Sequence, residues 1–147
     1  MNTMSKASDR ALELYMNQGY SCSESVFIAL AEVDGLSQEE IDYGNHYAGA
    51  FSGGMGAESV CGALTGGMLT LGRYFGRNMG EDRKTEMKDY STALFNAFVE
   101  EFGAPDCSVL KHEPDAKSRC AQYVRFVVET LEEYLDNGLP GAEDDCG

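Results

Sequence analysis

Residues 51–76 read FSGGMGAESVCGALTGGMLTLGRYFG, and the rest of the chain is organised around them. They hold eight of the 17 glycines, with Cys61 near the middle. Glycine loses more conformational freedom on folding than any other residue, so a stable domain concentrates it where the backbone turns sharply or approaches another group closely. The GGMG run at 53–56 predicts a tight turn. A helix is expected to follow from about Glu58 or Ser59, with Cys61 in its first turn.

Small residues recur along this expected helix at a spacing of four. Gly62 and Gly66 form one pair, and Ala63 and Gly67 form another. Residues four apart lie on the same face of a helix. Each pair therefore makes a smooth strip, on which another helix or a cofactor can approach the backbone closely.

Helical periodicity extends over most of the remaining chain. Apolar residues recur three and four apart, and two capping-box patterns, Ser21 with Glu24 and Ser37 with Glu40, mark helix starts. No segment alternates as a strand would. The expected helices cover residues 5–18, 21–33, 37–51, 58–75, 81–102 and 114–137, with a short turn at 107–110. The sequence predicts an all-α bundle of five to six helices, a single domain over residues 1–138, followed by an acidic flexible tail at 139–147.

The charge balance argues against two classes of partner. Acidic residues number 25 against 11 basic ones, which gives a formal charge of −14. Nucleic acids and anionic membrane surfaces both attract clustered Lys and Arg, so we expect neither as a partner. The N-terminus has no apolar core of signal-peptide type, and no run approaches the ~18 apolar residues of a membrane span. We expect a cytoplasmic protein without membrane insertion.

Four of the five cysteines fall near expected helix starts. Cys22, Cys61 and Cys107 lie in or beside a first turn, and Cys120 lies about one turn after the start of the last helix. A helix N-terminus carries exposed N–H groups and a partial positive charge, which favours a thiolate over a thiol. Thiolates bind metal ions or attack disulfides. The odd number of cysteines and a reducing compartment argue against a structural disulfide framework.

The residues alone leave two interpretations of these thiols open. They could be reactive or metal-binding thiols, or they could only pack in the core, since buried cysteines often act as small apolar residues. Their separations of 39, 46 and 13 residues match no zinc ribbon, ferredoxin run or C-x-x-C motif. Cys146 lies in the acidic tail, where neighbouring carboxylates disfavour a thiolate, and we regard it as incidental. The two histidines, His46 and His112, are expected to be structural residues rather than ligands.

The cysteines and glycines nevertheless follow one another in a definite order. One cysteine follows the short first helix, the run CGALTGG occupies 61–67, a third cysteine follows the Phe-Gly stop at 102–103, and a fourth opens the last helix. This order, from about Tyr20 to Leu135, resembles the C-GCAxxG-C-C family, described as redox-active proteins of about this length with four invariant cysteines. The resemblance implies that four residues act as one group: Cys22, Cys61, Cys107 and Cys120.

Split-Soret cytochromes contain a similar cysteine-bearing domain, and that likeness implies an iron–sulfur cluster, of the 2Fe–2S type, held by the four thiolates. Four thiolates are also a full ligand set for zinc. The small residues would then leave room for inorganic atoms beside Cys61, which makes Gly62, Ala63 and Gly66 candidate cofactor contacts. The family brings no reaction, substrate or redox partner, so an electron carrier and an oxidoreductase both stay open.

Three functions compete on this basis. The first is electron transfer or redox sensing through an Fe–S cluster. The second is a metal-free thiol–disulfide protein, in which two of the four cysteines pair reversibly as the reactive thiols. The third is a zinc-binding or metal-carrier interaction module. The helices at 81–102 and 114–137 also have enough apolar surface for a homodimer.

Overall fold

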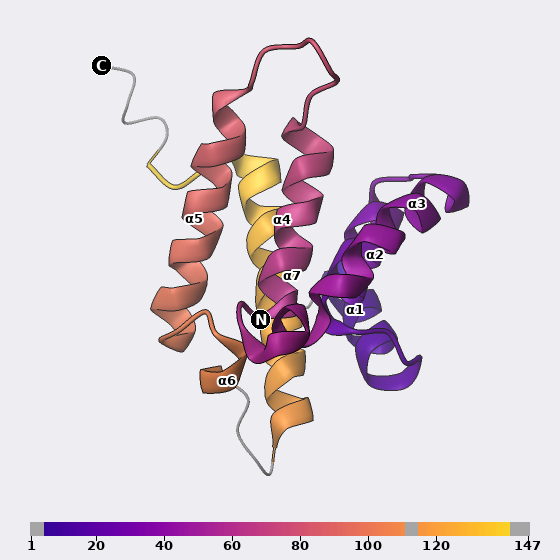
Figure 1. Cartoon of the computed structure of the whole chain (residues 1–147), viewed down its shortest axis with the longest axis vertical. Helices are drawn as coiled ribbons and strands as arrows, with labels where there is room; N and C mark the ends of the chain where they lie inside the picture. Colours follow the sequence, from indigo (N-terminus) through magenta and orange to yellow (C-terminus); the bar gives the residue numbers. More distant parts are fainter. Residues whose placement is uncertain (1–4, 111–114, 142–147) are drawn as a thin grey trace.

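The chain folds as a helical bundle, which confirms the predicted all-α class (Figure 1). The structure is a computed structural model that describes residues 5–110 and 115–141. These residues form seven α-helices, and the smallest of them is the short turn expected at 107–110. The helices are α1 (Lys6–Asn17), α2 (Cys22–Val33), α3 (Gln38–Ala48), α4 (Gly62–Phe75), α5 (Thr85–Phe102), α6 (Cys107–Leu110) and α7 (Ala116–Asn137). Within the described ranges, no helix combines the length and the apolar run needed to cross a bilayer.

Both predicted capping boxes are present. At the start of α2 the Ser21 N–H donates to Glu24 Oε1 (3.0 Å), and the Glu24 N–H donates back to Ser21 Oγ (3.4 Å). Ser37 and Glu40 make the same reciprocal pair at the start of α3. Each box provides acceptors for two backbone N–H groups that have no carbonyl partner within the helix, and this fixes where the helix begins.

Helix α4 lies at the centre of the bundle and contacts α2, α5 and α7. Both of its smooth strips are covered by other helices. A Cβ added at Gly66 would lie 2.6 Å from the Ser23 carbonyl oxygen of α2, and one added at Gly67 would lie 2.7 Å from Val127 of α7. The glycines therefore let α2 and α7 approach the α4 backbone more closely than any side chain would permit.

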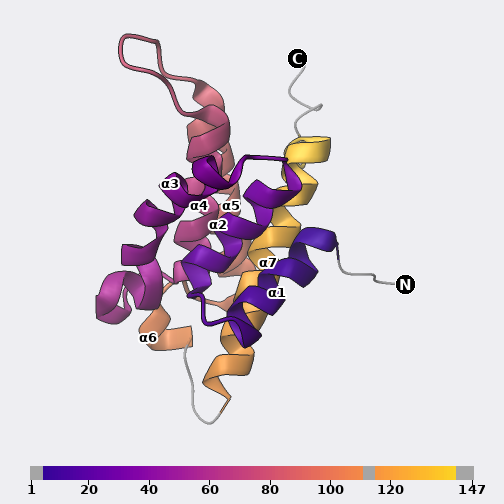
Figure 2. The same cartoon turned by 90° about the vertical axis from the view of Figure 1, so that its right-hand side faces the viewer.

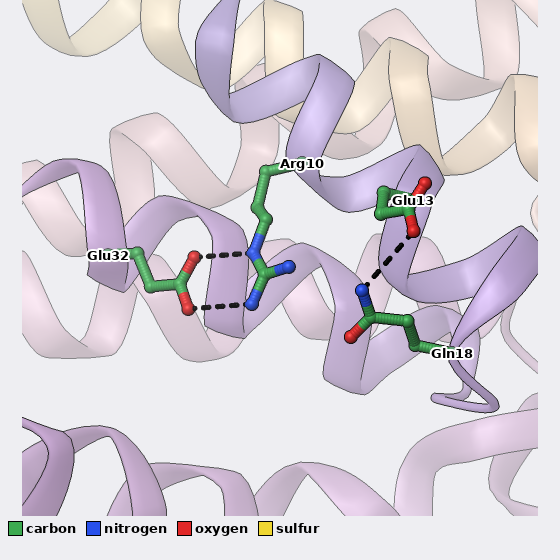
Figure 3. A network of polar contacts seen from close by, with 4 residues as sticks. All are labelled: Arg10, Glu13, Gln18 and Glu32. Atoms are coloured by element: carbon green, nitrogen blue, oxygen red, sulfur yellow. Dashed lines mark hydrogen bonds and ion pairs between the residues drawn. The ribbon is translucent and has the colours of Figure 1, made fainter.

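Helix α1 packs against α2 and α7 on the other side of the bundle (Figure 2). Its exposed face is linked to α2 by Arg10, whose guanidinium makes two contacts with the Glu32 carboxylate at 2.7 and 3.1 Å (Figure 3). In the same figure Gln18 donates to Glu13 at 3.2 Å and closes the end of α1. Such exposed pairs contribute little, so the buried apolar face of α1 holds the helix in place.

Several helix boundaries differ from the expected ones. The predicted start of α4 at Glu58 or Ser59 was wrong, because residues 54–58 form a separate distorted turn (η2, Gly54–Glu58) and α4 begins only at Gly62. Helix α5 begins at Thr85 rather than at Glu81, because the Glu81 carboxylate accepts from the Asn78 N–H (2.8 Å) and closes a turn before the helix. Residues 49–51, expected in the third helix, form a 3-10 turn (η1, Gly49–Phe51) instead.

Candidate functional site

The structure brings together the four cysteines that the family pattern groups. They line one cavity of about 250 Å³, although each comes from a different segment: the start of α2, the residue before α4, the start of α6 and the fifth residue of α7. Helix α6 and the first turns of α7 lie at the same end of the bundle in both views (Figures 1 and 2). The other residues that line the cavity are Tyr15, Ser21, Ser52, Gly53 and Gly62.

Cys61 and Cys107 are positioned by a short antiparallel contact between two loops. The Cys61 N–H donates to the Pro105 carbonyl (2.8 Å), and the Cys107 N–H donates to the Ser59 carbonyl (2.6 Å). Both cysteines are buried. Cys61 is thus the N-cap of α4 and not part of its first turn, because this pairing holds the residues before it in an extended conformation.

A left-handed turn delivers the chain to this contact. The backbone angle φ is positive at Gly53, Gly54, Met55 and Gly56, between 62° and 70°. Three of these residues are glycines, for which the conformation carries no steric penalty, whereas Met55 adopts it at a cost. A Cβ at Gly54 would lie 2.4 Å from the Ser59 backbone nitrogen and 3.0 Å from Cys107 Cβ. The predicted glycine turn at 53–56 therefore exists and packs directly behind Cys107.

Cys22 reaches the cavity because Gly62 has no side chain. A Cβ at Gly62 would lie 2.3 Å from Cys22 Sγ, far inside van der Waals contact. Of the three predicted cofactor contacts, only Gly62 lines the cavity. Gly66 lies against the Ser23 backbone, and Ala63 is fully buried without lining the cavity.

Burial has the largest effect on the pKa of the Cys61 thiol. It raises the pKa of this thiol to about 12, while the backbone N–H groups of Ala63 and Leu64 act in the opposite direction and favour the thiolate. These N–H groups face the sulfur without forming a cap hydrogen bond of normal geometry. The neighbouring sulfurs of Cys22 and Cys120 raise the pKa further. Burial in the cavity therefore favours the neutral thiol of Cys61 over its thiolate.

Tyr15 of α1 is a site residue that no sequence motif singles out. It lines the same cavity, and its pKa is raised by burial, by the charge of Cys120 and by a hydrogen bond between its hydroxyl and the Cys120 sulfur. Lys117 fixes it from α7, with Nζ 3.2 Å from the Tyr15 carbonyl oxygen and 4.5 Å from the centre of the ring. Its position on the apolar face of the first helix was the available signal, but that pattern does not distinguish a core tyrosine from one beside a thiol.

The four cysteines line a cavity but do not converge on a single metal-ion position. Within residues 5–110 and 115–141, no three His, Cys, Asp or Glu side chains converge as the ligands of one metal ion. Cys22 and Cys61 are free thiols. His46 is exposed on α3, next to the ring of Tyr43, and does not line the cavity. His112 and Cys146 lie outside the described residues.

Sequence comparison bears directly on this cysteine group. A family model described as "Putative redox-active protein (C_GCAxxG_C_C)" matches residues 20–134. The chain belongs to this family. A protein of Archaeoglobus fulgidus named "Uncharacterized protein" is 32% identical over 142 residues, which cover 88% of this chain and 93% of that protein. No solved structure matches. The matched range contains all four cavity-lining cysteines.

The donor set and the space fit an iron–sulfur cluster. Four thiolates are the full protein ligand set of such a cluster, and the cavity leaves room for inorganic atoms between them. The positions of two of the cysteines depend on glycines. A Cβ at Gly62 would overlap Cys22, and one at Gly54 would crowd Cys107.

Proposed function

We propose that this chain is a redox protein whose four cysteines hold an iron–sulfur cluster of the 2Fe–2S type. The observation that carries the proposal is that Cys22, Cys61, Cys107 and Cys120, from four separate segments, line one cavity of about 250 Å³. A cluster of this kind supplies a centre that takes up and releases one electron. An electron carrier or a redox sensor is the role that fits it.

The residues around the sulfurs have definite parts in this function. The N–H groups of Ala63 and Leu64 and the hydroxyl of Tyr15 direct partial positive charge at the sulfurs of Cys61 and Cys120, which stabilises the reduced, more negative state. Burial of Cys61 keeps water away from one side of the site. The thiol of Cys61 gives up its proton when the site is loaded, so loading is favoured by higher pH.

Anaerobic reconstitution with iron and sulfide tests the proposal. The loaded protein is expected to be coloured and to contain iron, and Cys61→Ser is expected to lose most of both. Cys146→Ser is the matched control, because that cysteine falls outside the family pattern, and it should behave as the wild type. Failure of the wild-type protein to take up iron would contradict the cluster.

A metal-free thiol–disulfide protein is the second candidate, and one contact favours it. The Cys22 sulfur packs against Gly62, the residue after Cys61, and both thiols are free. The pair to form would be Cys22 with Cys61, with the two protons and two electrons passing to an oxidant such as another disulfide. Mass spectrometry after mild oxidation would then show a loss of about two mass units confined to these two cysteines.

A zinc-binding module has less support, because a closed zinc site brings four ligands to about 2.3 Å from one ion. Such convergence is absent among the described His, Cys, Asp and Glu side chains. Stoichiometric zinc without iron in the purified protein would favour this alternative over the cluster.

A further inference from the structure

A second cavity lies at the opposite end of α4 from the cysteines. It has a volume of about 430 Å³, and its lining comes from the end of α4, the loop that follows and the start of α5. Figure 1 shows this loop arching over the adjacent ends of the two helices. Helix α4 has 14 residues, so its two ends are about 20 Å apart at about 1.5 Å per residue. The cavity is therefore separate from the redox site, and its volume is within the range of roughly 300–1,000 Å³ that is usual for small-molecule sites.

Positive charge is concentrated around this cavity. Arg77, Arg83, Lys84 and Lys88 line it, which is four of the 11 basic residues of a chain whose net charge is −14. No acidic residue lines it, although Glu81, Asp82, Glu86 and Asp89 are close in sequence. Within the described part of the chain, none of the four cations forms an ion pair. A cleft lined by one sign of charge focuses its field and attracts an ion of the other sign.

The start of α5 adds to this field. Lys84 is the residue before the first turn of α5, and no side chain caps that turn. The N-terminus of an 18-residue helix carries a partial positive charge and open N–H groups, a combination that binds phosphate in many proteins. The two guanidinium groups can each contact two oxygens of one phosphate.

The floor of the cavity is apolar. Phe75 and Met87 are half-buried against the core, and the ring of Phe75 is fixed by Tyr90, with ring centres 4.8 Å apart. The loop above them is also ordered by its own hydrogen bonds, including one from Arg77 Nη1 to the Glu81 carbonyl (3.2 Å). A bare phosphate would leave this apolar floor unused, whereas an aromatic ring would cover it.

We propose that this cavity binds a phosphorylated aromatic small molecule of mononucleotide size. The phosphate contacts Arg77, Arg83 and the N-terminus of α5, and the aromatic part lies on Phe75 and Met87. An acidic protein docking on the same cations is the weaker alternative, because a redox partner must approach the cysteines, and these lie at the other end of α4. The ligand therefore acts as an effector or a second substrate rather than as a direct contact of the cysteines.

Isothermal titration calorimetry with AMP, GMP, CMP, UMP and FMN tests this site. Binding of at least one of these compounds is expected, and adenosine or riboflavin should bind at least tenfold more weakly than its phosphorylated form, since charge-assisted contacts are lost. Inorganic phosphate should compete weakly. No binding of any of the five at about 1 mM, or equal binding of the dephosphorylated compound, would overturn the proposal.

Charge-reversal variants locate the binding. Arg83→Glu and Lys84→Glu should each weaken the best ligand by about ten- to a hundredfold. Lys6→Glu is the matched control, because it reverses an exposed cation on α1, away from this cavity, and it should change the affinity less than twofold. The iron content after reconstitution should be the same in all three variants, which separates this site from the cysteine site. Unchanged affinity in both Arg83→Glu and Lys84→Glu, with circular dichroism showing a folded protein, would place the ligand elsewhere and refute the assignment.

Discussion

Replacing Gly62 by alanine tests how closely Cys22 packs against α4. The added Cβ would lie 2.3 Å from Cys22 Sγ and 3.2 Å from the Phe51 carbonyl oxygen. Ordinary contact requires about 3.4–4 Å, so the sulfur must move by more than about 1 Å. Overpacking of this kind costs about 1–3 kcal/mol, and the better helix propensity of alanine returns at most about 1 kcal/mol. We expect Gly62→Ala to lower the free energy of unfolding of the metal-free protein by about 1–2 kcal/mol.

The same displacement moves one of four ligands, so the variant should also take up less iron on reconstitution. Urea denaturation followed by circular dichroism measures the stability, and iron analysis measures the loading. Gly72→Ala is the matched control, since it makes the same change in the same helix with nothing within 4 Å of the new Cβ. It should stabilise the protein by about 0.5–1 kcal/mol through helix propensity.

A double-mutant cycle isolates the contact itself. In Cys22→Ala the sulfur is absent, so adding Gly62→Ala to that background should cost about 1 kcal/mol less than it does in the wild type. Equal stability of Gly62→Ala and the wild type, or equal costs in the two backgrounds, would show that Gly62 does not hold this space open.

Three further changes have definite expected outcomes. Because burial raises the pKa of Cys61 from 9.0 to about 12, the native thiol keeps its proton where the unfolded chain loses it. The free energy of unfolding of the metal-free protein should therefore fall above about pH 9, by up to about 1.4 kcal/mol per pH unit, and urea denaturation at several pH values should show a shallower fall in Cys61→Ala. Met55→Gly should raise the melting temperature, because it relieves about 1 kcal/mol of strain from the left-handed backbone conformation, and Gly56→Ala should lower it. A lower melting temperature in Met55→Gly would mean that the methionine side chain stabilises the fold by more than its backbone conformation costs. Tyr15→Phe removes the hydroxyl that hydrogen-bonds to the Cys120 sulfur. Redox titration of the reconstituted protein should therefore show a midpoint potential lower by about 40 mV, which corresponds to a hydrogen bond of about 1 kcal/mol. An unchanged midpoint potential would show that Tyr15 does not tune the site.

The cysteine cavity and the cationic cavity lie at opposite ends of α4. The cysteines gather at the end where α4 begins, and the cationic cavity lies at the end where α4 finishes. Helix α4 is packed on both sides through glycines, so the two ends are connected by one closely held element. The two proposals remain independent, because each set of variants leaves the other site intact.

Much of the fold could be predicted from the sequence because its signals are local. The capping boxes at Ser21 and Ser37 and the apolar spacing along α7 report bonds between residues three and four apart. These interactions are the same wherever the helix sits in the fold, so the helices were found and the all-α class was correct. The glycine turn at 53–56 was also visible, because few other residues adopt its backbone angles.

The start of α4 could not be predicted in the same way. Helix propensity alone allows residues 58–61 to join the helix, but the Cys61 and Cys107 N–H groups bond to carbonyls of the opposite loop instead. That pairing joins segments more than 40 positions apart, and no local pattern reports it. The role of Tyr15 could not be predicted for a related reason, since the thiol beside it comes from α7.

The sequence by itself determined the helices, the order of the cysteines and the two smooth strips of α4, because backbone hydrogen bonding and residue size act over one or two turns. Only the tertiary structure decided that four thiols from four segments surround one cavity, that Gly62 rather than Ala63 or Gly66 borders it, and that four cations gather at the far end of α4. Those arrangements depend on how helices pack across the bundle, where contacts join residues that are distant in the chain.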